Sequence, residues 1–173
     1  MNALSLLISA TLLTSAISFG QTNAESPRVT LQLTPLLPPG QTTIAAGSTF
    51  SVVMYANSPG QLVNMYGYQF DLKFDSNKLQ ALQVSEGVSF KNTGESDFIP
   101  GIINNPAGMI GTSFNSLQGK TASVAALLSA LVVVQFKAIQ AGSTDISLQY
   151  PVLLDPTGAR VPLTLAPLTI TVQ

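Results

Sequence analysis

Apolar and polar residues alternate along the middle of the chain. Over residues 66–74 an apolar side chain falls on every second position. Successive side chains of a strand point to opposite faces, so this spacing predicts a strand with one buried and one solvated face. The polar cluster at residues 75–78 is typical of a turn, because short polar side chains bond their own backbone. We therefore expect Phe70 in the core and Asp71 and Lys73 at the surface.

Similar alternation recurs elsewhere, separated by segments rich in proline and glycine that fit turns and sheet edges. Many short strands without alternating helices favour an all-β sandwich. In one expected strand the pattern places Ile110, Thr112 and Phe114 on the same side. Alanine and leucine at helical spacing predict one or two turns of helix near residues 121–128. The further strands are expected at residues 28–34, 49–56, 79–84, 109–115, 130–138, 145–153 and 161–172.

The N-terminus carries an apolar run at residues 4–19, interrupted only by small and hydroxyl side chains and followed by small and polar residues. This arrangement predicts a secretory signal peptide over residues 1–24, a mature domain over residues 25–173, and a secreted protein. No lysine or arginine precedes the run. The alternative is a membrane anchor that is not cleaved, although the run is shorter than the ~20 apolar residues that span a bilayer.

Composition narrows the function classes. The chain has no cysteine and no histidine, which removes thiolate nucleophiles, disulfides, imidazole bases and the commonest zinc ligands. Charged residues make up 9% of the chain and the formal net charge is −1, so no basic patch is available to neutralise phosphates. We therefore expect neither nucleic-acid binding nor an electrostatic attachment to a membrane.

The carboxylates do not suggest catalysis. A glycosidase needs two of them flanking one bond, whereas those of this chain fall mostly in expected turns or on the solvated side of a strand. We predict no catalytic residues, no metal site, no cofactor and no enzyme activity. A calcium site built from Asp75, Asn77 or Asp155 is the alternative, but the loops lack dense Asp and Asn spacing, and turn capping is favoured.

Five segments stand in a distinctive order and spacing: residues 46–52 (AGSTFSV), 66–75 (YGYQFDLKFD), 79–87 (LQALQVSEG), 130–138 (ALVVVQFKA) and 141–144 (AGST). Together they resemble a cohesin domain, the extracellular β-sandwich module that binds dockerins. The resemblance runs from about Val29 to the C-terminus. It implies a cohesin-like β-sandwich with jelly-roll topology and about nine strands, related to certain cellulose-binding modules.

The resemblance also implies a binding face made from the solvated sides of two strands, around residues 67–75 and 131–138. The partner would be a dockerin-type or other secreted protein, with the calcium dependence on the partner's side, and the complex would belong to an assembly that degrades polysaccharide. In the second strand, Leu131 and Val133 would face outward if its other aliphatic residues fill the core. Cover by residues 121–128 is an equal alternative. The residues expected to bind the partner are Gln69, Asp71, Lys73, Leu131, Val133 and Gln135.

Two further observations bear on the partner. The well-studied dockerin-binding cohesins carry an Asn and an Asp where this chain has Gly67 and Gln69, so their specificity is not carried over. Binding to a polysaccharide is the second hypothesis. It calls for a row of flat aromatic rings, whereas the chain has no Trp and four Tyr. Of these, Tyr55 and Tyr150 are the candidates for exposure.

Overall fold

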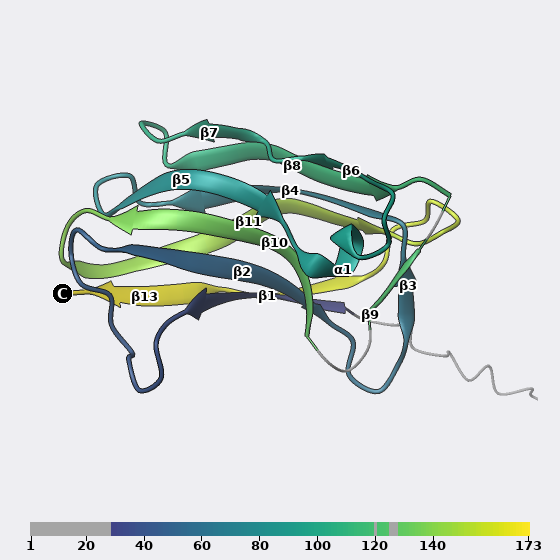
Figure 1. Ribbon diagram of the computed structural model, residues 1–173, viewed down its shortest axis with the longest axis horizontal. Helices are drawn as coiled ribbons and strands as arrows, with labels where there is room; N and C mark the ends of the chain where they lie inside the picture. The colour runs from purple at the N-terminus through teal and green to yellow at the C-terminus, as the bar shows by residue number, and fades with distance from the viewer. Residues whose placement is uncertain (1–28, 120, 125–127) are drawn as a thin grey trace, which may run out of the picture.

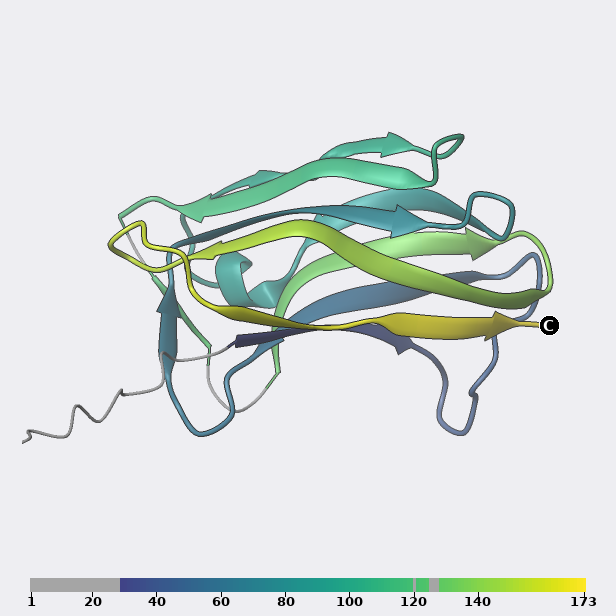
Figure 2. The ribbon, with the colours of Figure 1, turned by 180° about the vertical axis from the view of Figure 1, so that it is seen from behind.

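The computed structural model describes residues 29–119, 121–124 and 128–173, except for the side chains at 123 and 124. The predicted signal peptide at residues 1–24 therefore lies outside the described residues. The alternating segments form strands, and two sheets pack face to face with their apolar sides together (Figures 1 and 2). The predicted all-β sandwich is confirmed.

The first sheet has five strands in the order β12-β1-β2-β10-β5. Its pairs are antiparallel except β1 with β12, which run parallel. Buried and more exposed residues alternate along most of β1 and in parts of β2, β5 and β10, as a half-buried sheet requires, whereas the edge strand β12 has no buried residue. The bounds are β1 Val29–Leu36, β2 Thr49–Asn57, β5 Leu79–Glu86, β10 Ser129–Ala138 and β12 Leu163–Ala166.

The second sheet has six strands. Five follow the path β13-β11-β4-β8-β6, and the sixth, β7, pairs with a different part of β8 than β6 does. The strand predicted at residues 66–74 is its centre, β4. After Ala166 the C-terminal segment leaves the first sheet, and it joins the second as β13. The bounds are β4 Gly67–Phe74, β6 Ser96–Ile99, β7 Ile102–Asn104, β8 Met109–Leu117, β11 Gly142–Leu154 and β13 Leu168–Val172.

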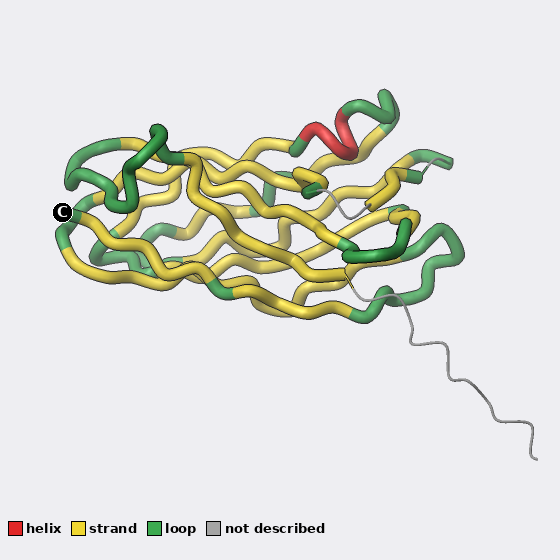
Figure 3. Tube along the Cα trace, turned by 90° about the horizontal axis from the view of Figure 1, so that it is seen from below, coloured by secondary structure: helices red, strands yellow, loops and turns green. Residues whose placement is uncertain are grey.

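The helix is not where the sequence predicted it. The one described helix, α1, spans Val88–Lys91, while Ala122–Val124 forms β9 and pairs with β3, Val63–Met65. Residues 125–127 lie outside the described residues. Helix α1 packs its Phe90 ring against Tyr68 of β4, with ring centroids 5.0 Å apart. The helix, red in Figure 3, and the β3–β9 pair lie at the end of the sandwich away from the C-terminus.

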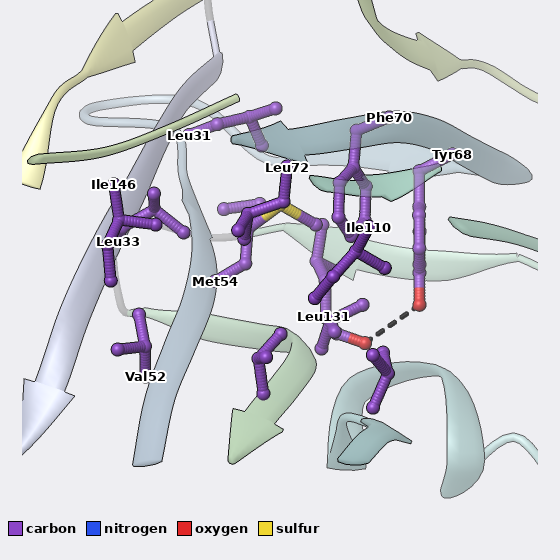
Figure 4. Packing of buried hydrophobic residues seen from close by; sticks show 14 of the residues in the cluster. Leu31, Leu33, Val52, Met54, Tyr68, Phe70, Leu72, Ile110, Leu131 and Ile146 are labelled. Carbon is purple, nitrogen blue, oxygen red and sulfur yellow. Dashed lines mark hydrogen bonds between the residues drawn. The ribbon is translucent and has the colours of Figure 1, made fainter. Parts of the chain in front are cut away.

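The core fills the space between the two sheets, and Figure 4 shows part of it. Phe70 and Phe74 of β4 are 2% and 4% exposed, whereas Lys73 between them is exposed, which confirms the predicted face of this strand. Phe74 meets Phe136 of β10 edge to face across the sheets, with ring centroids 5.3 Å apart. Such pairs add to the burial of apolar area that holds the two layers together.

Candidate functional site

The six residues predicted to bind a partner do not form one surface. Gln69, Asp71 and Lys73 lie on β4, in the six-stranded sheet, and turn to its outer side. Val133 and Gln135 lie on β10, in the five-stranded sheet, and turn to the opposite outer side of the sandwich. The expectation that these two strands share a binding face is wrong, because the core lies between them.

Leu131 is buried, and the expectation that it faces outward is also wrong. Its side chain is 0% exposed, as is that of Val132. The pairing of β10 with β2 shifts register between Ala130 and Val132, and this bulge turns two consecutive side chains inward. The Leu131 carbonyl accepts hydrogen bonds from the Gly87 N–H and the Tyr68 hydroxyl, each at 2.8 Å, and the second is the dashed line of Figure 4.

The outer face of the six-stranded sheet carries an unusual row of side chains. Residues directly opposite each other in antiparallel strands lie on the same face. The registers between β11 and β4, β4 and β8, and β8 and β6 therefore align four residues across the sheet. We call them the recognition row: Val152, Gln69, Phe114 and Ile99.

Large apolar side chains of this face are open to solvent. Ile99 is 55% exposed, Ile102 of the neighbouring β7 is 77% exposed and Tyr150 of β11 is 78% exposed. Phe114 and Val152 are partly exposed. Among them Phe114 and Ile99 are direct cross-strand neighbours, and exposed apolar residues that lie together indicate an interaction site more than single ones do. Apart from Gln69, sequence reasoning missed this row because its members come from four strands whose order in the sheet was unknown.

Two bulges flank Asp71 at the centre of the same face. On one side the β4–β11 register shifts between Gln149 and Val152, and on the other the β4–β8 register shifts opposite Asp71. Each bulge contains a non-glycine residue with a positive φ, Tyr150 at 50° and Thr112 at 56°. Within the described residues these are the only such cases. Strained backbone of this kind clusters at binding sites.

The bulge in β8 also overturns a sequence prediction. Ile110 and Phe114 were expected on the same side, but Ile110 is 1% exposed and in the core, while Phe114 turns outward. Thr112, expected on the side of Ile110, is exposed. Gly111, which precedes Thr112 inside the strand, was the sequence signal for an irregularity there.

Carboxylates outnumber cations on this face. Asp71, Asp97 and Asp145 each accept a hydrogen bond, from the Thr112 N–H at 2.7 Å, the Gln118 amide and the Thr169 hydroxyl respectively. Lys73 is the cation beside them. Lys73, Asp97 and Asp145 are exposed and Asp71 is half-buried, and exposed charges contribute orientation more than affinity to a complex.

The candidate calcium residues serve as turn caps. The Asp75 carboxylate accepts from the Asn77 N–H at 2.9 Å, and the Asp155 carboxylate accepts from the N–H groups of Thr157 and Ala159. The hydrogen bond from the Thr157 hydroxyl is the main cause that lowers the pKa of Asp155. Over the described part of the chain, no group of three or more Asp or Glu side chains could hold a metal ion.

A partly buried polar cluster joins the two sheets near α1. Glu86 at the end of β5 accepts hydrogen bonds from the Asn115 amide at 2.8 Å and from the Ser96 hydroxyl. Burial raises the pKa of the neighbouring Tyr68 well above its usual range, so its hydroxyl stays a donor to the Leu131 carbonyl. Tyr68 and Asn115 are buried, whereas Glu86 and Ser96 are half-buried, and hydrogen bonds between groups of the two sheets are suited to holding the layers in register.

Loops at the two ends of the sandwich enclose two surface hollows. One is lined mainly by residues from 36 to 50, and the other by residues 62–64 together with 155–162. Neither hollow contains Tyr55 or Tyr150, and these two tyrosines lie on strands of different sheets. Among the described residues, no helix is long and apolar enough to cross a bilayer.

Solved structures of cohesins share this architecture. A type II cohesin from a cohesin–X-dockerin complex of Acetivibrio cellulolyticus matches with a TM-score of 0.64 and 16% identity, over 84% of this chain and 99% of that one. The cohesin module of a Clostridium perfringens family 33 glycoside hydrolase gives 0.63 and 11%, over 86% and 98%. At these identities the likeness concerns the fold.

A third match is the cohesin of a type I cohesin–dockerin complex from Clostridium thermocellum, with a TM-score of 0.60 and 11% identity over 86% of this chain and 94% of that one. No curated protein sequence matches the chain. The family model of the cohesin domain, a non-catalytic binding module, matches residues 37–165. Since that match covers most of the chain, the protein belongs to the cohesin domain family.

Proposed function

We propose that this chain is a secreted, non-catalytic recognition module that binds a dockerin-type protein through the outer face of the six-stranded sheet. The observation that carries the proposal is the recognition row, in which Val152, Phe114 and Ile99 expose apolar surface across one sheet. A few desolvated apolar anchors with a polar rim are the usual anatomy of a protein interface.

The opposite face lacks such a row, because the exposed large apolar residues of the five-stranded sheet, Leu36, Leu82 and Leu165, are not paired with one another across its strands. Its corresponding row, Leu36, Ser51, Gln135 and Gln83, is polar apart from Leu36 at the β1 end. Val133 is partly covered, and its neighbour Val53 on β2 is 2% exposed. Of the residues predicted from sequence, Gln69, Asp71 and Lys73 therefore belong to the proposed site, whereas Leu131, Val133 and Gln135 do not.

The proposal is tested with a dockerin panel. The panel contains purified X-dockerin of Acetivibrio cellulolyticus, the dockerin of the Clostridium thermocellum complex, and any dockerin-bearing protein that this chain captures from the secretome of its source organism. Binding is measured by calorimetry in calcium and in chelator. Dockerins fold around calcium, so binding should disappear in chelator. Absence of binding to every member in calcium would refute a dockerin-type partner.

Matched variants locate the binding face. Phe114→Asp and Val152→Asp place a charge in the recognition row, and we expect each to weaken binding by about 30-fold or more, the effect of removing an anchor. Gln135→Asp puts the same charge on an exposed position of the opposite face and should change binding less than about twofold. Equal losses for Phe114→Asp and Gln135→Asp would move the site off the six-stranded sheet.

Polysaccharide binding is tested alongside the panel. The two tyrosines that could have formed a sugar platform, Tyr55 and Tyr150, lie in different sheets, so they do not form one aromatic row. We therefore expect the chain to stay in the supernatant when insoluble cellulose or chitin is pelleted. Retention of the chain on either polysaccharide, together with no binding to any dockerin of the panel, would favour the carbohydrate-binding hypothesis instead.

A further inference from the structure

The outward direction of Phe114 depends on one irregularity in β8. Phe70 of β4 faces Ser113 and Leu72 faces Ile110, so two residues of β8, Gly111 and Thr112, stand opposite Asp71 alone. In an unbroken strand Ile110 and Phe114 would point to the same side, since they are four residues apart. The extra residue lets Ile110 enter the core while Phe114 turns to the outer face.

Side chains and backbone from both neighbouring segments hold this bulge. The Asp71 carboxylate accepts the Thr112 N–H at 2.7 Å, in the place where the regular ladder is interrupted. On the other side the Ser113 hydroxyl donates to the Pro100 carbonyl at 2.8 Å. A Cβ at Gly101 would lie only 2.6 Å from the Gly111 carbonyl oxygen, so the break between β6 and β7 fits closely against the bulge.

The left-handed backbone of Thr112 needs such support. A β-branched residue at a φ of 56° is strained, and a strained conformation persists only where surrounding contacts fix it. The Thr112 N–H has left the ladder, and in this exposed position its acceptor is the Asp71 carboxylate rather than water alone. The Asp71 carboxylate satisfies the N–H and fixes the peptide at the same time. Asparagine has the same length and an equivalent oxygen acceptor, whereas alanine has none.

We propose that Asp71 is a positioning residue, whose carboxylate holds the Thr112 bulge and thereby sets the register that turns Phe114 toward the partner. The inference rests on the proposed function for its consequence in binding, but the hydrogen bond from the Thr112 N–H to the Asp71 carboxylate is a property of this chain alone. It gives Asp71 a different role from the one expected from sequence, where it was a surface charge available to the partner.

Amide hydrogen exchange of the full chain, followed by NMR, tests the hydrogen bond between Asp71 and Thr112 without any partner. Asp71→Ala should make the Thr112 amide exchange at least about tenfold faster, because a hydrogen bond to a charged acceptor is lost. Asp71→Asn should keep the protection within about threefold. Lys73→Ala, on the same strand and face, is the matched control and should leave Thr112 unchanged. Unchanged protection in Asp71→Ala, or equal loss in Asp71→Asn, would overturn the proposal.

A second variant keeps the test decisive if Asp71→Ala does not fold. Glycine adopts a positive φ without strain, so the double variant Asp71→Ala with Thr112→Gly should recover folding. Failure of this rescue would place the role of Asp71 outside the bulge and overturn the proposal.

Binding to the dockerin panel shows whether Asp71 acts by positioning Phe114 or by a direct contact of its charge with the partner. We expect Asp71→Asn to bind within about threefold of the wild-type protein and Asp71→Ala to bind at least about tenfold more weakly. Loss of binding in Asp71→Asn with Thr112 still protected would show a direct charge contact and overturn the positioning role. If no panel member binds the wild-type protein, the dockerin hypothesis fails, while amide exchange still decides the role of Asp71.

Discussion

The two outer faces of the sandwich are built by the same alternation of residues, yet they present different surfaces. On the five-stranded sheet the outward positions of β2 and β10 include Ser51, Gln135 and Lys137, and the row through Gln135 is mostly polar. On the six-stranded sheet the row through Gln69 exposes three apolar side chains, beside two bulges with left-handed residues. The difference indicates that composition along a strand matters less than which strands become neighbours.

A charge introduced on the inward side of β10 should lower the free energy of unfolding far more than one introduced on its outward side. Leu131→Asp buries an unpaired carboxylate in the core, and we expect it to lower the free energy of unfolding by more than about 4 kcal/mol or to prevent folding. Gln135→Asp, four residues along the strand and exposed, should stay within about 0.5 kcal/mol of the wild-type protein. Urea unfolding followed by circular dichroism measures both. A Leu131→Asp protein with normal stability would contradict the bulge between Ala130 and Val132 that turns Leu131 inward.

A side chain of the six-stranded sheet bonds to the backbone of an edge strand of the other sheet. The Asn105 side chain, in the turn between β7 and β8, accepts the Ala81 N–H of β5 at 2.7 Å and donates to the Ala81 carbonyl at 3.0 Å. Asn105→Ala removes both hydrogen bonds, and we expect a loss of about 1 to 3 kcal/mol in the free energy of unfolding. Asn104→Ala, whose carboxamide caps the same turn at an exposed position, is the control and should cost less. The reverse order would mean that Asn105 does not join the sheets.

The smallest expected effect concerns strain on the six-stranded face. Tyr150 holds a φ of 50°, which alanine tolerates poorly and glycine adopts freely. We therefore expect Tyr150→Gly to be more stable than Tyr150→Ala by about 1 kcal/mol, contrary to the usual order of these residues in strands. Thermal unfolding of the pair measures the difference. If alanine were the more stable substitution, the left-handed conformation would be wrong.

Much of the fold could be predicted from sequence because it depends on local periodicity. The faces of Phe70, Phe74 and Lys73 follow from alternation alone, and the structure confirms them. The helix prediction failed because alanine and leucine at residues 121–128 have helical propensity, whereas tertiary pairing with β3 makes Ala122–Val124 a strand. Propensity decided less here than the availability of a pairing partner.

The candidate site was harder to predict, for two physical reasons. The resemblance to cohesins led us to place β4 and β10 on one face, and period-two alternation could not correct this, because it tells which side of a strand is solvated but not which sheet the strand joins. Alternation itself failed at Leu131 and Phe114, where one inserted residue reverses the pattern beyond it. Gly111 and Pro151 inside their strands were signals of such breaks, but neither gives the position of the bulge in the sheet.

The Asn105 amide has a consequence for the solubility of the protein as well as for its stability. Strand β5 is an edge strand of its sheet, and an unpaired edge is a template on which a second chain can add a strand and begin to aggregate. The carboxamide occupies both backbone groups of Ala81 and so imitates one residue of a neighbouring strand. A single side chain from the opposite layer thus interrupts the free edge of β5, and it keeps foreign strands from pairing there.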